Sequence, residues 1–173
     1  VKPSHKVHKL KARIYAFPNK KNKIGDLPFG SKLKVYKKSL KFVKLYKGWI
    51  EKKNIKPLNF REKDLFHRAK YFKNIPYKWG GKTSLGFDCS GLIQSVLKAC
   101  GYRIPRDSFQ QKEFFNDCVI DLEDSKCGDL HFFGKSDKVS HVAFSLGGLD
   151  FIHSQGNVKI ESLYKSSNNK IIF

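Results

Sequence analysis

The spacing at which hydrophobic residues recur changes near residue 59, and this change limits the folds that the chain can adopt. Before this point, apolar and polar residues alternate in short runs such as residues 32–36 and 41–46, as in strands with one buried face. After it, Leu65, Ala69 and Phe72 recur at helical spacing. We therefore expect a small all-β domain followed by a second domain, with the boundaries 1–58 and 59–173.

A longer helix is predicted to begin near Cys89, because the apolar residues that follow it also recur at helical spacing. Asp88 is a suitable N-cap for this helix, and Gly101 is suited to the left-handed turn after its end. Strands are expected later, at residues 129–133, 139–146 and 149–154 and within residues 158–173. Helices first and a sheet second predict an α+β fold for the second domain.

Cys89 would lie in the first turn of the longer helix. Unpaired backbone N–H groups and the positive end of the helix dipole stabilise a thiolate there, so we expect a lowered pKa for the Cys89 thiol. The same N–H groups can hold the oxyanion that forms when a carbonyl is attacked. Even at a helix start, Cys89 could equally be a structural residue. The other cysteines lack the CxxC spacing of zinc sites, and we expect small buried hydrophobic residues at Cys100, Cys118 and Cys127.

Two histidines on neighbouring predicted strands could supply a base. A two-residue turn at Gly147 and Gly148 would place His141 and His153 on opposite faces of the sheet. A three-residue loop over residues 146–148 would set them directly across from each other, and glycine supplies the left-handed residue that such loops need. We expect the second register, with His153 fixing the tautomer and orientation of His141. We interpret the other four histidines as structural or solvated: His5, His8, His67 and His131.

Positive charge is concentrated in the first domain. Residues 1–58 contain 18 Lys or Arg and two acids, which is +16 of the net +20. A surface this basic attracts anionic polymers, lipid headgroups or nucleic acids, although a lysine-rich solvated surface is an equal alternative. The aromatic residues of this domain alternate as in a barrel core, so we do not expect nucleic acid as the physiological partner. No apolar run approaches the roughly 20 residues of a membrane helix, and no signal-peptide pattern is visible.

The second domain resembles the NlpC/P60 family of papain-like cysteine peptidases. The resemblance rests on six segments that occur in the order of the family: residues 77–81, 87–91, 105–108, 128–130, 141–143 and 152–154. It implies that Cys89 is the nucleophile, His141 the base and His153 the third, orienting residue. Tyr77 matches a tyrosine near the nucleophile, which could help the Cys89 N–H to stabilise the oxyanion. The resemblance implies hydrolysis of peptidoglycan peptides between γ-D-glutamate and a diamino acid, with no metal or cofactor.

The first domain resembles the bacterial SH3-like domain, through residues 27–30, 33–35 and 48–50. The whole chain is then expected to join a small SH3-like β-barrel to a papain-like α+β domain, as a monomer. We expect residues 1–58 to contact an anionic wall polymer or a membrane surface. The cell envelope or the exterior is the expected location, with the cytoplasm as the alternative.

Residues 106–108 are similar to a segment in family members that carry such a domain and trim released peptides. By that resemblance Asp107 and Ser108 bind the free amine of an N-terminal L-alanine, although Asp107 could equally be a helix cap. Further substrate contacts are expected from Asp88, Ser90, Trp79 and a tyrosine of the first domain, Tyr46 or Tyr36. Two other functions stay open: an endopeptidase that acts on intact wall, and an inactive protein that binds polyanions or cell wall.

Overall fold

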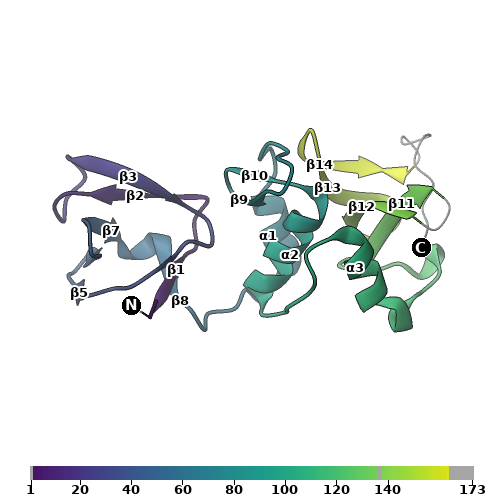
Figure 1. Cartoon of the computed structure of the whole chain (residues 1–173), viewed down its shortest axis with the longest axis horizontal. Coiled ribbons are helices and arrows are strands. Elements are labelled where there is room, and N and C mark those ends of the chain that lie inside the picture. Colours follow the sequence, from purple (N-terminus) through teal and green to yellow (C-terminus); the bar gives the residue numbers. More distant parts are fainter. Residues whose placement is uncertain (1, 136–137, 164–173) are drawn as a thin grey trace. The chain divides into compact units, whose positions relative to one another are not determined.

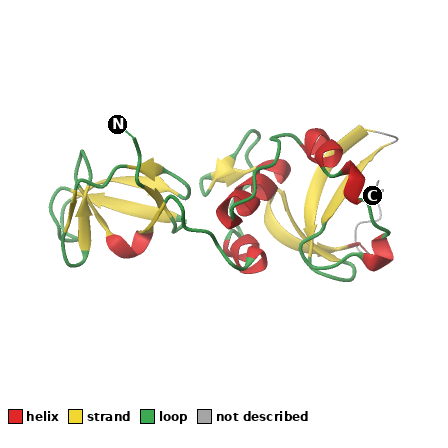
Figure 2. Ribbon diagram, turned by 90° about the horizontal axis from the view of Figure 1, so that it is seen from below, coloured by secondary structure: helices red, strands yellow, loops and turns green. Residues whose placement is uncertain are grey.

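The computed structural model describes residues 2–135 and 138–163, which form two compact units, Val1–Phe60 and Arg61–Phe173 (Figures 1 and 2). The first unit consists almost entirely of strands, whereas the second combines helices with an antiparallel sheet. Among the described residues, no helix is long and apolar enough to cross a membrane.

The first unit contains two antiparallel sheets that enclose one apolar core. The sheets have the orders β4-β1-β8 and β3-β2-β7-β6-β5. Their strands are β1 (His5–Val7), β2 (Lys11–Tyr15), β3 (Lys23–Pro28), β4 (Lys32–Leu33), β5 (Lys37–Lys38), β6 (Phe42–Lys44), β7 (Trp49–Glu51) and β8 (Ile55–Pro57), with a 3-10 turn, η1 (Lys52–Asn54), before β8. Strands β1, β2, β4, β6, β7 and β8 contribute to a shared core, which consists of Val7, Ala12, Leu33, Val43, Leu45, Ile50 and Ile55.

Two polar residues of this unit lie in paired strands. His5, which we interpret as structural or solvated, lies in β1 and pairs with both Leu33 and Pro57. Asp26 belongs to β3, which pairs with β2. Ion pairs from Lys11 and Lys23 to Asp26 accompany this pairing, so a residue type common in turns is accommodated in a strand.

The second unit packs its longest helix against a four-stranded sheet. The sheet has the order β11-β12-β13-β14, and α2 packs on β12 and β13 (Figure 1). The helices are α1 (Leu65–Tyr71), α2 (Cys89–Cys100) and α3 (Ser108–Phe114), with 3-10 turns η2 (Asn116–Cys118) and η3 (Leu122–Asp124). The strands are β9 (Lys82–Thr83), β10 (Gly86–Phe87), β11 (Leu130–Lys135), β12 (Lys138–Ser145), β13 (Asp150–Gln155) and β14 (Asn157–Ser162).

The hairpin that joins β12 to β13 differs from the predicted register. Phe144 pairs with Ile152, and the N–H of Leu146 donates to the carbonyl of Asp150 at 2.8 Å. The three-residue loop therefore covers residues 147–149 rather than 146–148, with both glycines in the left-handed region. Continued along the strands, this register sets Ala143 opposite His153. His141 and His153 then share a face as diagonal neighbours, which long side chains can span.

Two of the three cysteines expected in the core are at the surface. Cys118 and Cys127 are exposed, and Cys100 is half-buried. Cys118 ends η2, and Cys127 lies between η3 and β11. These short turns provide no sheet or helix face that could cover a side chain, so the small size and apolarity of cysteine do not decide its position.

Gly91 lies where α2 passes the loop around Gly81, and its size is predicted to matter for stability. Alanine normally favours a helix over glycine by about 1 kcal/mol. A Cβ at position 91, however, would lie 2.1 Å from the carbonyl oxygen of Gly81 and 2.7 Å from Oδ1 of Asp88. We therefore expect Gly91→Ala to destabilise the protein by about 2–3 kcal/mol, measured as a lower free energy of unfolding in urea.

Lys98→Ala is the matched control, since Lys98 is exposed on the same helix. Its free energy of unfolding should change by less than about 0.5 kcal/mol. Equal stability of the Gly91→Ala variant and the unsubstituted protein would show that the loop at Gly81 is not held against α2 as described.

Candidate active site

Cys89 is the first residue of α2, as predicted. The carboxylate of Asp88 caps the helix by accepting a hydrogen bond from the N–H of Gly91 at 2.7 Å. At the other end, Gly101 adopts φ +107°, which confirms the predicted glycine stop. The local sequence therefore fixes where the helix begins, and with it the position of the thiol.

Burial changes the expected acidity of this thiol. The pKa of Cys89 is raised, because loss of solvent disfavours the thiolate more than the nearby N–H groups favour it. Backbone N–H groups of Ser90, Val142 and Cys89 itself act in the opposite direction by hydrogen bonding to the sulfur. The predicted lowering of the pKa is therefore wrong, and the thiol at rest is neutral. The contact with Val142 places the sulfur beside the strand residue that follows His141.

His141 and His153 form a hydrogen-bonded pair on this side of the sheet. Nε2 of His141 lies 2.7 Å from Nδ1 of His153, and the rings meet edge to face. Burial lowers the pKa of each imidazole from 6.5 to about 4. Both rings are therefore neutral near pH 7, and a neutral imidazole can accept a proton from a thiol.

A fourth residue, Glu161, extends the pair and was not predicted from the sequence. Its Oε2 lies 2.9 Å from Nε2 of His153, in a contact that lacks the alignment of a hydrogen bond. Nζ of Lys159 in turn lies 2.7 Å from Oε1 of Glu161. The sequence of β14 alternates, so residues 159 and 161 can be expected on one face of the strand. That this is the face of the histidines follows only from the pairing of Lys159 with His153, which the sequence does not reveal.

The carboxylate of Glu161 has a consequence for the tautomers of the two histidines. It can only accept, so it favours a proton on Nε2 of His153. Nδ1 of His153 then accepts the hydrogen bond from Nε2 of His141. This leaves Nδ1 of His141 with a free lone pair, which makes Nδ1 the basic atom of the pair.

Arg106 holds two residues that were expected to bind substrate. Its guanidinium donates to both carboxylate oxygens of Asp88, at 3.0 and 2.5 Å, and to Oγ of Ser90 at 2.9 Å. The buried side chain of Gln111 supports this arrangement by donating to the carbonyl of Pro105 at 3.0 Å and to that of Ser90 at 3.2 Å. Asp88 and Ser90 therefore have internal partners, and both are buried.

The remaining predicted contacts lie at four places. Asp107 is exposed and is the N-cap of α3 in a capping box, with its N–H donating to Oε1 of Gln110 at 3.3 Å, and Ser108 is the first residue of that helix. Burial raises the pKa of Tyr77, and electrostatic repulsion from Cys89 and Asp88 raises it further. Trp79 is 87% exposed, and Tyr46 belongs to the first unit.

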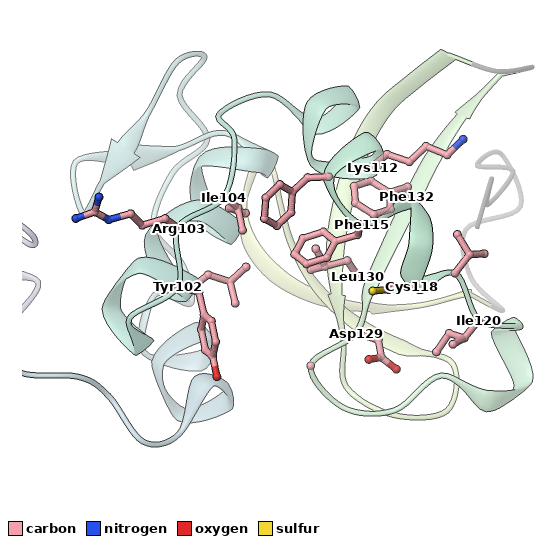
Figure 3. Close-up of a pocket in the computed structure, with 14 residues that line it drawn as sticks. Tyr102, Arg103, Ile104, Lys112, Phe115, Cys118, Ile120, Asp129, Leu130 and Phe132 are labelled. Atoms are coloured by element: carbon pink, nitrogen blue, oxygen red, sulfur yellow. The ribbon is translucent and has the colours of Figure 1, made fainter.

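A cavity of about 380 Å³ in the second unit is separate from these residues (Figure 3). Its lining is mostly apolar and includes Ile104, Phe115, Leu130 and Phe132, which Figure 3 labels. None of Cys89, His141 and His153 lines it. His131 is buried, and its Nε2 lies 2.9 Å from Oγ of Ser125.

Comparison with known proteins finds several similar chains. Curated relatives include the gamma-D-glutamyl-L-lysine dipeptidyl-peptidases of Bacillus subtilis, 39% identical over 94 residues, and Bacillus cereus, 42% identical over 95 residues. The matched regions are 53% of this chain in both cases, but only 31% and 28% of those proteins. The probable endopeptidase p60 of Listeria monocytogenes is 34% identical over 97 residues, which are 56% of this chain and 20% of that protein.

A solved structure and a family model extend the comparison. The crystal structure of an NlpC/P60 family protein from Bacillus cereus superimposes with a TM-score of 0.79 and 29% identity, and covers 95% of this chain and 59% of that one. The model of the NlpC/P60 family matches residues 74–173, which include Cys89, His141 and His153. This match spans more than half of the sequence, and the chain therefore belongs to the NlpC/P60 family.

Proposed function

We propose that the chain is a cysteine peptidase that hydrolyses the bond between γ-D-glutamate and a diamino acid in peptides derived from peptidoglycan. The proposal depends most on one observation: the sulfur of Cys89 contacts the N–H of Val142, next to a histidine that a second histidine orients at 2.7 Å. The names of the two Bacillus relatives support the choice of bond. The substrate and the bond remain proposals, because the chain matches less than a third of those proteins.

The reaction would begin with a neutral thiol and a neutral imidazole. Nδ1 of His141 takes the proton as the sulfur of Cys89 attacks the γ-glutamyl carbonyl. The N–H of Cys89 and the hydroxyl of Tyr77 stabilise the oxyanion. The protonated His141 then gives its proton to the leaving amine, and a pKa of about 4 makes this transfer favourable. Water activated by the same imidazole hydrolyses the thioester and restores the thiol.

We propose Asp107 as the acid that binds the free amine of an N-terminal L-alanine. Asp88 is already paired with Arg106 and caps α2, so its charge is satisfied within the protein. Asp107 is exposed, and a helix cap uses only part of the accepting capacity of a carboxylate. Ser108 adjoins it, and Trp79 is exposed enough to contact the peptide. We also propose that residues 1–58 are an SH3-like domain.

Two other functions are alternatives to the proposed one. An endopeptidase acting on intact wall would use the basic first unit as an anchor, and the name of the Listeria relative is compatible with it. An inactive protein that binds wall or other polyanions would not need the thiol beside the histidine pair. That combination therefore favours an enzyme.

The first test is mass spectrometry of the products formed from L-Ala-γ-D-Glu-L-Lys. We expect L-Ala-D-Glu and free lysine from the unsubstituted protein, and a loss of about 10³-fold or more in kcat with Cys89→Ala. Acetylation of the peptide amine should raise KM strongly if Asp107 binds that amine, and Asp107→Asn should reduce the difference between the two peptides.

Cys127→Ala is the control for this test, because Cys127 is exposed and distant in sequence from the site. Release of fragments from whole sacculi but not from the free tripeptide would favour the wall endopeptidase. Absence of products from both substrates would favour the inactive protein.

The pH dependence of kcat/KM tests the resting protonation state. Below its pKa, His141 carries a proton and cannot accept one from the thiol; above it, the ring is neutral and can. Because burial lowers this pKa to about 4, the acid limb of the profile should lie near pH 4 rather than near 6.5. Intrinsic fluorescence over the same pH range distinguishes protonation from unfolding. An acid limb between pH 6 and 7 would contradict a buried neutral imidazole.

Charge-removing substitutions at Glu161 and Lys159 should move this acid limb in opposite directions. Glu161 raises the pKa of both histidines and Lys159 lowers it. Glu161→Gln should therefore shift the limb to lower pH and reduce kcat about 3–10-fold with little change in KM, since the base is weaker and less well oriented. Lys159→Gln should shift the limb to higher pH.

NMR titration of the imidazole protons provides a second measurement of the same two shifts. Glu123→Gln is the matched control, because Glu123 is exposed in η3 and touches neither histidine. Identical titration curves for the Glu161, Lys159 and Glu123 variants would show that β14 does not act on the histidine pair.

A further inference from the structure

The first unit has a hollow of about 660 Å³ that combines lysines with exposed aromatic rings. Its floor contains the buried side chains of Leu33 and Leu45. Around the floor lie Pro3, Lys32, Lys34, Tyr36, Tyr46 and Lys47. Neither the proposed peptidase chemistry nor the comparisons assign a role to the lysines of this hollow.

The lysines of the hollow are available to a ligand. Lys32, Lys34 and Lys47 are exposed, and none of them forms an ion pair within the described part of the chain. The two acids of residues 1–58 are already paired with lysines elsewhere: Asp26 with Lys11 and Lys23, and Glu51 with Lys20 and Lys53. The positive charge at the hollow is therefore not neutralised from within the first unit.

The walls of the hollow are fixed by backbone hydrogen bonds. The N–H of Ser4 donates to the carbonyl of Leu33 at 2.9 Å, and the N–H of Tyr36 donates to that of Lys44 at 2.9 Å. The N–H of Leu45 donates to the carbonyl of Gly48, also at 2.9 Å, and this bond fixes the backbone next to Tyr46 and Lys47. Because the backbone is already ordered, a ligand would lose little affinity to ordering the protein.

The aromatic rings distinguish the classes of polyanion. Tyr36 is 52% exposed and Tyr46 is 81% exposed, so two ring faces are open at the hollow. Tyr15 and Phe42 are buried in the core, and Trp49 is half-buried. The hollow therefore does not continue as the extended row of rings on which single-stranded nucleic acids stack their bases. Two open rings flanked by cations match a chain in which phosphates alternate with sugars or polyols.

We propose that this hollow binds an anionic polymer of the cell wall in which phosphodiesters link polyols or sugars. The lysines would pair with successive phosphates, and the tyrosine rings would contact the carbon faces between them. The choice of a wall polymer over other polyanions relies on the proposed function, which places the substrate in peptidoglycan. The binding itself needs no hydrolysis, so it can be tested whether or not the peptidase proposal holds.

The test is co-sedimentation of the full chain with purified bacterial walls that carry such a polymer, and with the same walls after hydrofluoric acid has removed it. We expect the unsubstituted protein to bind the intact walls at least about tenfold more tightly than the stripped walls, with an affinity that falls as salt rises. A Lys32→Ala/Lys34→Ala/Lys47→Ala variant should lose about tenfold or more of this affinity.

The matched control removes three exposed lysines of the same unit outside the hollow, Lys21, Lys38 and Lys41. It has the same net charge as the first variant and should lose about threefold at most, since more distant charges are screened. Equal thermal unfolding midpoints of the two variants establish that both are folded.

Three results would overturn the proposal. Equal losses in the two triple variants would mean that binding follows net charge and not the hollow. Equal binding to stripped and intact walls would mean that the ligand is not the phosphate polymer. Tighter binding to single-stranded DNA, or to vesicles of anionic lipid, at the same ionic strength would assign the hollow to another class of polyanion.

Discussion

The carboxylate of Asp88 connects the parts of the candidate site. It accepts from the N–H of Gly91, which fixes the first turn of α2 and so the position of Cys89. It also accepts two hydrogen bonds from Arg106, which tie the segment before α3 to the same helix end. Together with the contacts of Gln111 to Ser90 and Pro105, this group joins the proposed nucleophile to the segment proposed to bind the peptide amine. Loss of the carboxylate would also leave a guanidinium that is only partly exposed without its partner, which is costly.

Features fixed by neighbouring residues could be predicted from the sequence. The cap at Asp88, the stop at Gly101 and the helix-start position of Cys89 depend on residues close together in the chain, and all three are found in the structure. The presence of both histidines on one hairpin is equally local, because alternation and two glycines are enough to indicate it. The family resemblance was found from the same short segments, and the match over residues 74–173 confirms it.

Features set by burial and strand register could not be predicted in this way. A shift of the β12–β13 loop by one residue changes which residues pair, yet it leaves the alternation pattern the same. Glu161 contacts His153 only because β14 folds back on β13 in a particular register. The sign of the pKa shift at Cys89 depends on how much water the folded chain excludes, and a helix-start position carries no information about that.

Burial acts on the proposed nucleophile and the proposed base in a complementary way. It raises the pKa of the Cys89 thiol and lowers that of His141 to about 4, so both groups are neutral before substrate binds. A thiolate and an imidazolium would attract each other at rest, and this attraction would have to be overcome when the sulfur attacks. With a neutral pair, charge separates only as the carbonyl is attacked. During this attack, the N–H groups of Cys89 and Val142 and the negative charge of Glu161 can stabilise the separated charges. A neutral thiol is a weaker nucleophile than a thiolate, so the reaction then depends on a base that is held in position. The contact of 2.7 Å with His153 holds His141 in this way.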